Sequence, residues 1–318
     1  MPAVLRHPHP RNHGGAPGGT GGIVRPRFWG LLLAMAGCAL AHAGQPAADL
    51  HARYLALQDR LNDNAFQRPL FLDSNETVKS LRGEVFAVIA RPFATVRPSL
   101  QDIGPWCDIL ILHLNVKGCR ATVTPPTQTL RMNFGRKHEE PLAQAYPVDF
   151  DFRVAAADDS YLQVLLRADT GPMGSRNYRI ELEAVPLPDG RTFLHLSYAY
   201  EYGFAVRLAM KGYLATLGSG KVGFSMADRQ PDGTAGLITG VRGVVERNTM
   251  RYYLAIEAYL GSLAVPPADR LEQRLHGWFA ATERFSRQLH EIDESAYLKM
   301  KRQEVLRQQT DAGPVPPA

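Results

Sequence analysis

The feature that most constrains the fold is a twofold alternation of apolar and polar residues that recurs between residues 119 and 202. Val148, Phe150 and Phe152, for example, are each followed by a charged residue, and the segment 178–184 shows the same rhythm. Successive side chains of a β-strand point to opposite faces of a sheet, so this rhythm predicts strands with one buried face and one face toward water. With the turn residues between them, six successive strands are expected, which is typical of an antiparallel sheet.

A further strand and two short helices are predicted immediately before these six strands. The β-rich run 84–89 is followed by Pro92, which suits the first position of a helix, and a glycine and a proline at 104–105 precede a second helix at 106–114. Upstream, leucines and a tyrosine recur at helical spacing, so the segment 44–82 is expected to form a helical lead-in.

The last third of the chain is predicted to be mainly helical. Apolar residues between 271 and 292 step alternately by four and three, which indicates one helix of about 33 Å, long enough to lie across a sheet. The segment at about 203–263 is expected to be an insertion of helices and a hairpin. The Pro- and Gly-rich residues 311–318 are expected to form a disordered tail.

Residues 1–43 have the pattern of a secretion signal. Arg25 and Arg27 precede the apolar run 28–40, which is too short to span a bilayer, and a small-x-small cleavage pattern ends at Ala43. We therefore expect an exported, periplasmic protein, with a translation start near Val24 because the region before the arginines is unusually long. An alternative interpretation is a lipoprotein anchored through Cys38, in which case the protein would contact the membrane.

Export bears on the two cysteines that remain after cleavage. An even pair in an oxidising compartment is usually bridged, so a disulfide between Cys107 and Cys119 is predicted. Two free buried thiols are the alternative. A metal site is not expected, because zinc sites need three or four ligands at closer spacing.

The charge of the mature chain argues against a nucleic-acid partner. The formal net charge of the whole sequence is +5, but its first 43 residues contain four arginines and no acidic residue. The remainder is close to neutral, and no element concentrates lysine and arginine on one face, as binding to phosphate backbones would require.

No combination of residues forms a recognisable catalytic motif. The glycine-rich stretch 217–221 lacks the spacing of a phosphate loop, and His138 with its two following glutamates is expected in a solvated loop. Asp108 and His113 are poorly spaced for a dyad, and His195 is expected on the outer face of its strand. We therefore predict no catalytic residue, no metal and no cofactor.

The order of elements and one local motif resemble the START-like (SRPBCC, helix-grip) superfamily. The motif comprises the segment 88–96, with its Arg-Pro-Phe helix start, together with Leu100 and Pro105-Trp106. Two features depart from the family pattern. About 60 residues intervene between the last strand and the long helix, and the cysteine pair is not part of the general pattern.

The resemblance implies an α+β domain over residues 83–310, in which a curved antiparallel sheet of about seven strands grips a long C-terminal helix. It further implies an elongated cavity for a lipid or another apolar or amphipathic small molecule. Because no catalytic motif is found, we predict binding without catalysis. Aromatic residues are the predicted wall of this site: Trp106, Tyr198, Tyr200, Tyr202, Tyr252 and Tyr253. Two alternatives stay open, namely a cyclase- or hydrolase-like enzyme on the same fold, and an envelope scaffold in which these residues fill the core.

Overall fold

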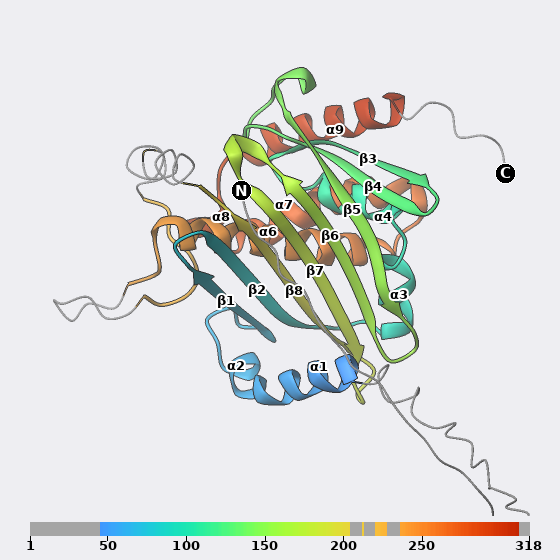
Figure 1. Cartoon of the computed structure of the whole chain (residues 1–318), viewed down its shortest axis with the longest axis vertical. Coiled ribbons are helices and arrows are strands. Elements are labelled where there is room, and N and C mark those ends of the chain that lie inside the picture. Colours follow the sequence, from blue (N-terminus) through green and yellow to red (C-terminus); the bar gives the residue numbers. More distant parts are fainter. Residues whose placement is uncertain (1–44, 204–211, 213–219, 228–235, 312–318) are drawn as a thin grey trace, which may run out of the picture. The chain divides into compact units, whose positions relative to one another are not determined.

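The computed structural model describes residues 45–203, 212, 220–227 and 236–311 (Figure 1). These residues belong to one compact unit, His42–Ala318. The predicted leader and nearly all of the predicted tail lie outside the described residues, as does part of the insertion predicted at about 203–263. Among the described helices, none combines the length and the apolar character needed to cross a membrane.

The alternating segments form one open sheet in which every strand is antiparallel to its neighbours. The strand order is β1-β2-β8-β7-β6-β5-β4-β3, so β1 and β3 are the two edges. The strands are β1 (Leu70–Glu76), β2 (Ser80–Ile89), β3 (Val116–Thr124), β4 (Thr127–Phe134), β5 (Tyr146–Ala157), β6 (Leu162–Thr170), β7 (Arg176–Pro186) and β8 (Thr192–Glu201). The predicted α+β class with an antiparallel sheet is therefore confirmed.

The helices lie before, within and after this sheet in the sequence. They are α1 (Gln45–Ala56), α2 (Gln58–Asn62), α3 (Phe93–Leu100), α4 (Gly104–Leu110), α6 (Gly240–Ser262), α7 (Arg270–Glu283), α8 (Ser286–Leu289) and α9 (Glu294–Asp311). Short 3-10 turns occur at Leu142–Gln144, Pro172–Gly174 and Pro267–Asp269.

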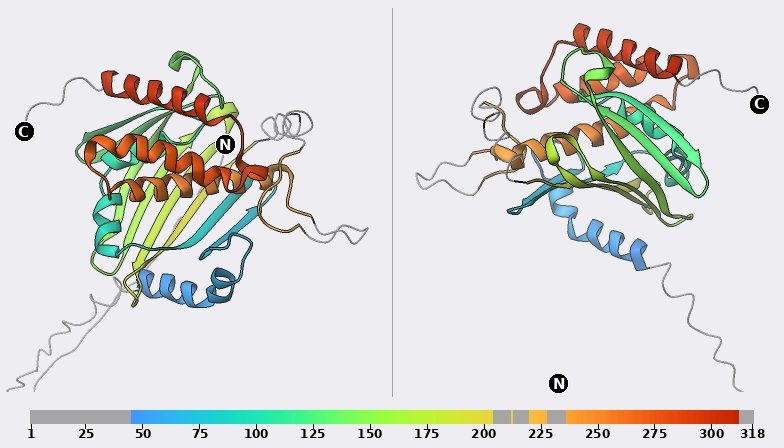
Figure 2. Two further views of the ribbon diagram at one scale, coloured as in Figure 1. Left: turned by 180° about the vertical axis from the view of Figure 1, so that it is seen from behind. Right: turned by 45° about the horizontal axis from the view of Figure 1, so that its top comes forward.

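The inner face of the sheet, which carries Val85 and Ala87, is covered by α6, and α7 packs on α6 in turn (Figure 2). Helix α6 lies very close to the sheet at Gly83 on β2. A Cβ atom at this position would lie 2.2 Å from Oγ1 of Thr249, far inside van der Waals contact. The absence of a side chain at Gly83 therefore allows α6 to lie directly on the sheet.

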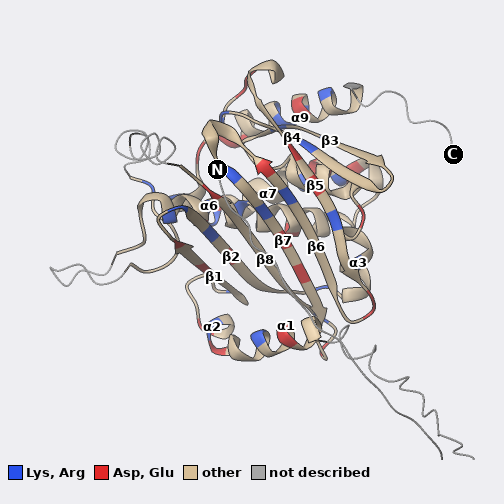
Figure 3. Cartoon of the chain, viewed as in Figure 1, with Lys and Arg blue, Asp and Glu red and all other residues tan. Residues whose placement is uncertain are grey.

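The outer face of the sheet is divided between an apolar end and a charged remainder. At the apolar end, α1 and α2 pack against Phe86, Val88 and Phe193. Elsewhere acidic and basic side chains are interspersed along the strands (Figure 3), as in the ion pair of 2.7 Å between Arg131 and Asp149. This division is typical of an antiparallel sheet with one solvated face.

The helix that lies on the sheet is α6 and not the predicted helix 271–292, which corrects the sequence interpretation. The residues expected to form that helix are divided into α7 and α8, with a break at Phe285, and α7 packs on α6 as a second layer. Because α6 is enclosed by the sheet on one side and by helices on the other, it is buried on most of its surface. Its sequence therefore lacks a single apolar stripe, and the predicted insertion 203–263 in fact contains this central helix.

The predicted helical lead-in is also only partly correct. The chain is helical up to Asn62, but β1 then adds an eighth strand beside β2. Leu70, Leu72 and Ser74 are buried on alternate positions, so the twofold rhythm is present. The alternation covers only these three buried positions before exposed polar residues follow. A pattern this short does not distinguish a strand from the end of a helix.

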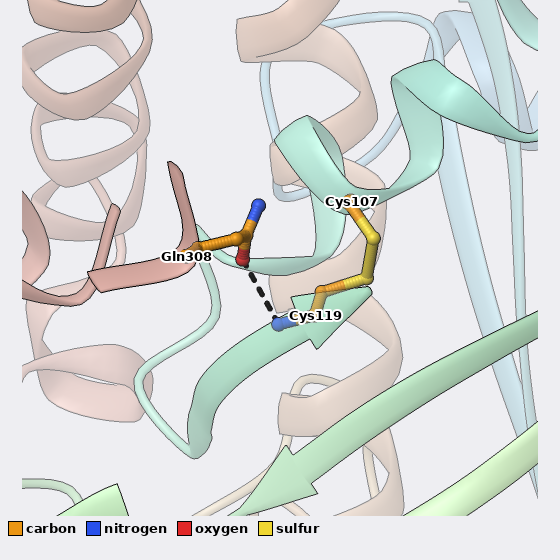
Figure 4. Close-up of a disulfide and its surroundings, with 3 residues drawn as sticks. All are labelled: Cys107, Cys119 and Gln308. Carbon is orange, nitrogen blue, oxygen red and sulfur yellow. Dashed lines mark hydrogen bonds between the residues drawn. A yellow bond between two sulfur atoms is a disulfide. The ribbon is translucent and has the colours of Figure 1, made fainter. Parts of the chain in front are cut away.

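The predicted disulfide between Cys107 and Cys119 is present, with a Cα–Cα distance of 5.2 Å. It joins α4 to the edge strand β3 (Figure 4). The backbone N–H of Cys119 donates a hydrogen bond of 2.9 Å to Oε1 of Gln308 on α9. The bridge therefore lies where a short helix, a sheet edge and the last described helix meet.

Candidate ligand-binding site

Four tyrosines meet between the inner face of the sheet and α6, and we call them the tyrosine cluster: Tyr178 on β7, Tyr198 and Tyr200 on β8, and Tyr252 on α6. The ring centroids of Tyr198 and Tyr252 are 5.3 Å apart, and those of Tyr178 and Tyr200 are 5.2 Å apart. Alternate positions on β8 share a face, which places two of these rings side by side at 5.6 Å. Each of the four side chains is at least nine-tenths buried.

The hydroxyl groups of the tyrosine cluster are largely without hydrogen-bond partners. The hydroxyl of Tyr178 lies 2.8 Å from Oγ of Ser175. No described residue forms a hydrogen bond with the hydroxyls of Tyr198, Tyr200 or Tyr252. These three hydroxyls are therefore available to donate or accept a hydrogen bond.

Burial also determines the protonation state of the cluster. It raises the pKa of Tyr198, Tyr200 and Tyr252, and the neighbouring tyrosines raise it further. The hydroxyls therefore remain protonated at neutral pH. They can donate or accept a hydrogen bond, but they do not supply a phenolate nucleophile.

His113, in the segment after α4, extends the tyrosine cluster. Its ring stacks on Tyr252 with centroids 4.6 Å apart, and the residue is only 2% exposed. Nδ1 accepts the backbone N–H of Asn115 at 3.1 Å, so in the neutral ring Nε2 carries the proton. Nε2 has no hydrogen-bond partner among the described residues. Burial lowers the pKa of His113 well below its usual value, and nearby cations lower it further.

The structure brings only part of the predicted wall together. Tyr198, Tyr200 and Tyr252 belong to the tyrosine cluster, and Tyr202 adjoins it with its ring 6.4 Å from that of Tyr200. The Tyr202 hydroxyl, however, is directed toward Glu76 and the backbone of the turn between β1 and β2.

The two other predicted residues lie elsewhere. Nε1 of Trp106 donates to the carbonyl of Leu100 at 2.9 Å, which fixes the connection between α3 and α4. Tyr253 lies on another side of α6, where its hydroxyl accepts a hydrogen bond of 3.0 Å from Arg68. The structure gives both side chains an evident structural contact.

Two members of the site were not predicted from the sequence. Tyr178 has the same alternating spacing as Ile180 and Leu182, so its inner-face position was available from the strand pattern. His113 was considered only as a partner of Asp108, and this dyad does not form, because Asp108 pairs with Arg274 at 2.6 Å. The stacking of His113 on Tyr252 joins residues 139 positions apart, which no local pattern predicts.

His195 lies on the outer face, as predicted, within a network of charged groups. Nδ1 donates to Glu183 at 2.8 Å and Nε2 to Glu84 at 2.9 Å, while the ring stacks on Phe86 at 4.4 Å. Burial alone would lower the pKa of His195, but the hydrogen bonds to both carboxylates outweigh it and raise the pKa. The His195 ring therefore links three neighbouring strands, and both of its nitrogens are engaged by carboxylates and so are not available for proton transfer.

Two cavities of the described part of the structure lie outside the layer between the sheet and α6. One, of about 500 Å³, is lined by Tyr54, Gln58, Leu61, Asn62, Gln67, Arg68, Pro69, Val88 and Arg191. The other, of about 320 Å³, lies beside the start of α3 and shares Arg191 with the first. Neither occupies the position of the predicted elongated cavity, where the tyrosine cluster is instead closely packed. No three His, Cys, Asp or Glu side chains of the described residues are grouped to hold a metal ion.

Comparisons with known proteins give remote structural similarities only. No family model matches the chain, and no curated protein matches it. The human StAR-related lipid transfer protein 5 is similar in structure with a TM-score of 0.30 and 12% identity, over 54% of this chain and 90% of that protein. A conserved protein of unknown function from Enterococcus faecalis has a TM-score of 0.31 and 8% identity, over 75% and 91% of the two chains. A protein from Mycobacterium smegmatis has a TM-score of 0.28 and 13% identity, over 47% and 89%. Scores this low do not assign the chain to a family.

Proposed function

We propose that the mature protein binds a small amphipathic molecule between the sheet and α6, outside the cytoplasm and without converting it chemically. The observation that carries this proposal is a group of polar atoms without hydrogen-bond partners among the described residues, namely the buried Nε2 of His113 and, in the same layer, the hydroxyls of Tyr198, Tyr200 and Tyr252. Small-molecule sites combine an apolar wall with a few polar groups that set orientation, and the aromatic rings and their polar atoms offer this combination. The predicted leader supports the location.

Binding requires a local rearrangement, because the tyrosine cluster is closely packed in this structure. We expect the rings of Tyr198 and Tyr252, now 5.3 Å apart, to separate as the ligand enters. Nε2 of His113 is buried without a partner, which is unfavourable in the closed arrangement, and a ligand that accepts a hydrogen bond from it offsets part of the free energy of opening.

A binding role is favoured over catalysis by the protonation states. The tyrosines stay protonated and His113 stays neutral, with Nδ1 engaged by the backbone of Asn115. None of these groups is paired as nucleophile and base, which covalent catalysis would require.

The test uses two adjacent tyrosines of α6 that differ in their hydrogen bonds. Tyr252→Phe removes a hydroxyl without a partner, whereas Tyr253→Phe removes one that is bonded to Arg68. Binding is measured by fluorescence with the neutral amphiphile N-phenyl-1-naphthylamine, and native mass spectrometry of protein from a bacterial periplasm detects a co-purifying ligand. We expect Tyr252→Phe to weaken binding about 3- to 10-fold or to lower ligand occupancy, with no loss of stability. Tyr253→Phe is the control, with unchanged binding and a lower free energy of unfolding.

The proposal is contradicted if the probe does not bind and no ligand mass is found before or after delipidation. It is also contradicted if Tyr252→Phe destabilises the protein while binding is unaltered. Either result would favour the second candidate function, an envelope scaffold with a filled core. One observation supports that alternative, since both cavities lie outside the sheet–helix layer.

A further inference from the structure

A group of cations, three of them buried and one partly exposed, lies beside His113, and we call it the basic cluster: Lys117 on β3, Lys137, Arg251 on α6 and Lys301 on α9. Nζ of Lys301 donates to the carbonyl of His113 at 2.8 Å, and Arg251 immediately precedes Tyr252 in the sequence. Lys117, Arg251 and Lys301 are at most 2% exposed. The charges of all four act on the His113 ring and lower its pKa in addition to burial.

The four cations of the basic cluster form ion pairs with two carboxylates among the described residues. Glu304 pairs with Lys301 at 2.7 Å and with Lys117 at 3.2 Å. Glu291 pairs with Arg251 at 2.8 Å and with Lys137 at 2.6 Å, and it also lies 3.7 Å from Lys221.

Among the described residues, these ion pairs join two carboxylates to five cations, and Lys137 and Arg251 take part in further interactions as well. A third carboxylate nearby, Glu140, accepts the backbone N–H of Arg136. Each cation has a partner, but among the described residues the basic side chains of this region outnumber the carboxylates that pair with them.

These basic side chains lie beside His113, whose Nε2–H is one of the hydrogen-bond donors of the proposed site. In the low dielectric of a protein interior, a surplus of one charge is unfavourable unless an ion of opposite sign compensates it. His113 can offer only the Nε2 proton, and the tyrosine hydroxyls are protonated and free to donate. A carboxylate is acceptor-only and can receive several such donors at once.

We infer that the ligand of the proposed site is an amphipathic anion, with its charged group beside His113 and the basic cluster and its apolar part among the rings of the tyrosine cluster. The inference rests on the proposed function and adds the charge of the ligand to it. A long-chain carboxylate is the simplest molecule of this class, and a phosphate or sulfate monoester offers the same acceptor chemistry.

The test compares four probes that share a twelve-carbon chain and differ in the polar group: dodecanoate, dodecyl phosphate, dodecanol and dodecylammonium. Dissociation constants are measured by displacement of N-phenyl-1-naphthylamine from the full mature protein below the critical micelle concentrations. We expect dodecanoate to bind at least 10-fold more tightly than dodecanol, and dodecylammonium to bind most weakly. The phosphate probe distinguishes between the two anionic head groups.

Two variants with matched controls locate the charged group. His113→Asn removes the Nε2 donor and keeps an acceptor for the backbone of Asn115, and His138→Asn on an exposed loop is its control. Lys137→Met removes one cation of the basic cluster from a partly exposed position, and Lys299→Met on the exposed side of α9 is its control. We expect His113→Asn and Lys137→Met each to reduce the preference for dodecanoate over dodecanol at least 3-fold, with both controls unchanged.

The outcomes separate this inference from the proposed function. Equal affinity for dodecanoate, dodecanol and dodecylammonium, or tighter binding of the alcohol or the amine, overturns the anionic ligand and leaves the binding function intact. Failure of all four probes overturns the binding function itself. If His113→Asn does not fold, Lys137→Met still decides the question, because its side chain is 28% exposed.

Discussion

The bridge between Cys107 and Cys119 offers the most quantitative prediction from this structure. The two cysteines are 12 residues apart, and closing a loop of this length removes conformational entropy from the unfolded chain. In the chain-entropy model this stabilises the fold by about 3 kcal/mol. The variant Cys107→Ala/Cys119→Ala is therefore expected to lose about 3 kcal/mol of unfolding free energy, equivalent to roughly 5 °C in Tm for a domain of this size.

The assay is urea denaturation of the oxidised wild type, the reduced wild type and the double variant. If the bridge acts through the unfolded chain, reduction and substitution lower the stability by similar amounts, and the denaturant slope increases because the unfolded chain becomes less compact. The hydrogen bond from Cys119 to Gln308 involves backbone and is retained in the variant. A loss below about 1 kcal/mol in both comparisons would refute the reasoning. It would show that α4 and β3 are held together by packing alone.

Three further predictions concern the packing and the buried charges. Gly83→Ala is expected to destabilise the protein by about 1–3 kcal/mol through the clash with Thr249, whereas Gly261→Ala, with open space at its Cβ position, has no such effect in thermal unfolding. His195 has a raised pKa, so its contribution is present at pH 6 and decreases as the pH rises through the folded-state pKa. The stability difference between wild type and His195→Gln should accordingly shrink between pH 6 and pH 9, and a constant difference would exclude this mechanism. Burial lowers the pKa of Lys301 to about 8, so the unfolded chain binds more protons between about pH 8 and pH 10, and wild-type stability should rise with pH in that window. Lys301→Met should lack this rise in urea denaturation, and an identical rise in both proteins would contradict the assignment.

The sheet could be predicted from the sequence because most of its strands have one solvent-exposed face and one buried face. Every second residue of β5 and β7 is apolar, and this local pattern is sufficient to place each side chain. Helix α6 could not be assigned its role in the same way. It is enclosed on most sides, so its apolar residues do not form one stripe. Helix α7 is exposed on one side and therefore has a clear apolar stripe, which led to the wrong prediction that this helix lies on the sheet.

The candidate site was predictable only where its members follow strand periodicity. Tyr198 and Tyr200 share a face because they are two residues apart, and β-sheet geometry alone places them together. His113 and the basic cluster come from β3, α6, α9 and two connecting segments, and they meet only through the tertiary fold. The partnerless state of their polar atoms is likewise a property of the assembled core, and no sequence pattern encodes it.

The strand order also has a consequence for how the chain reaches its native state. β2 is completed by β8, and the contact between Arg82 and Ser197 joins residues 115 positions apart. The hairpin formed by β1 and β2 therefore has an unpaired edge at β2 until the chain has been synthesised as far as β8. A topology with such distant pairings has a high contact order, which slows folding and prolongs the exposure of apolar strand surface. Until β8 is in place, the apolar face of this first hairpin is therefore the part of the chain most exposed to aggregation.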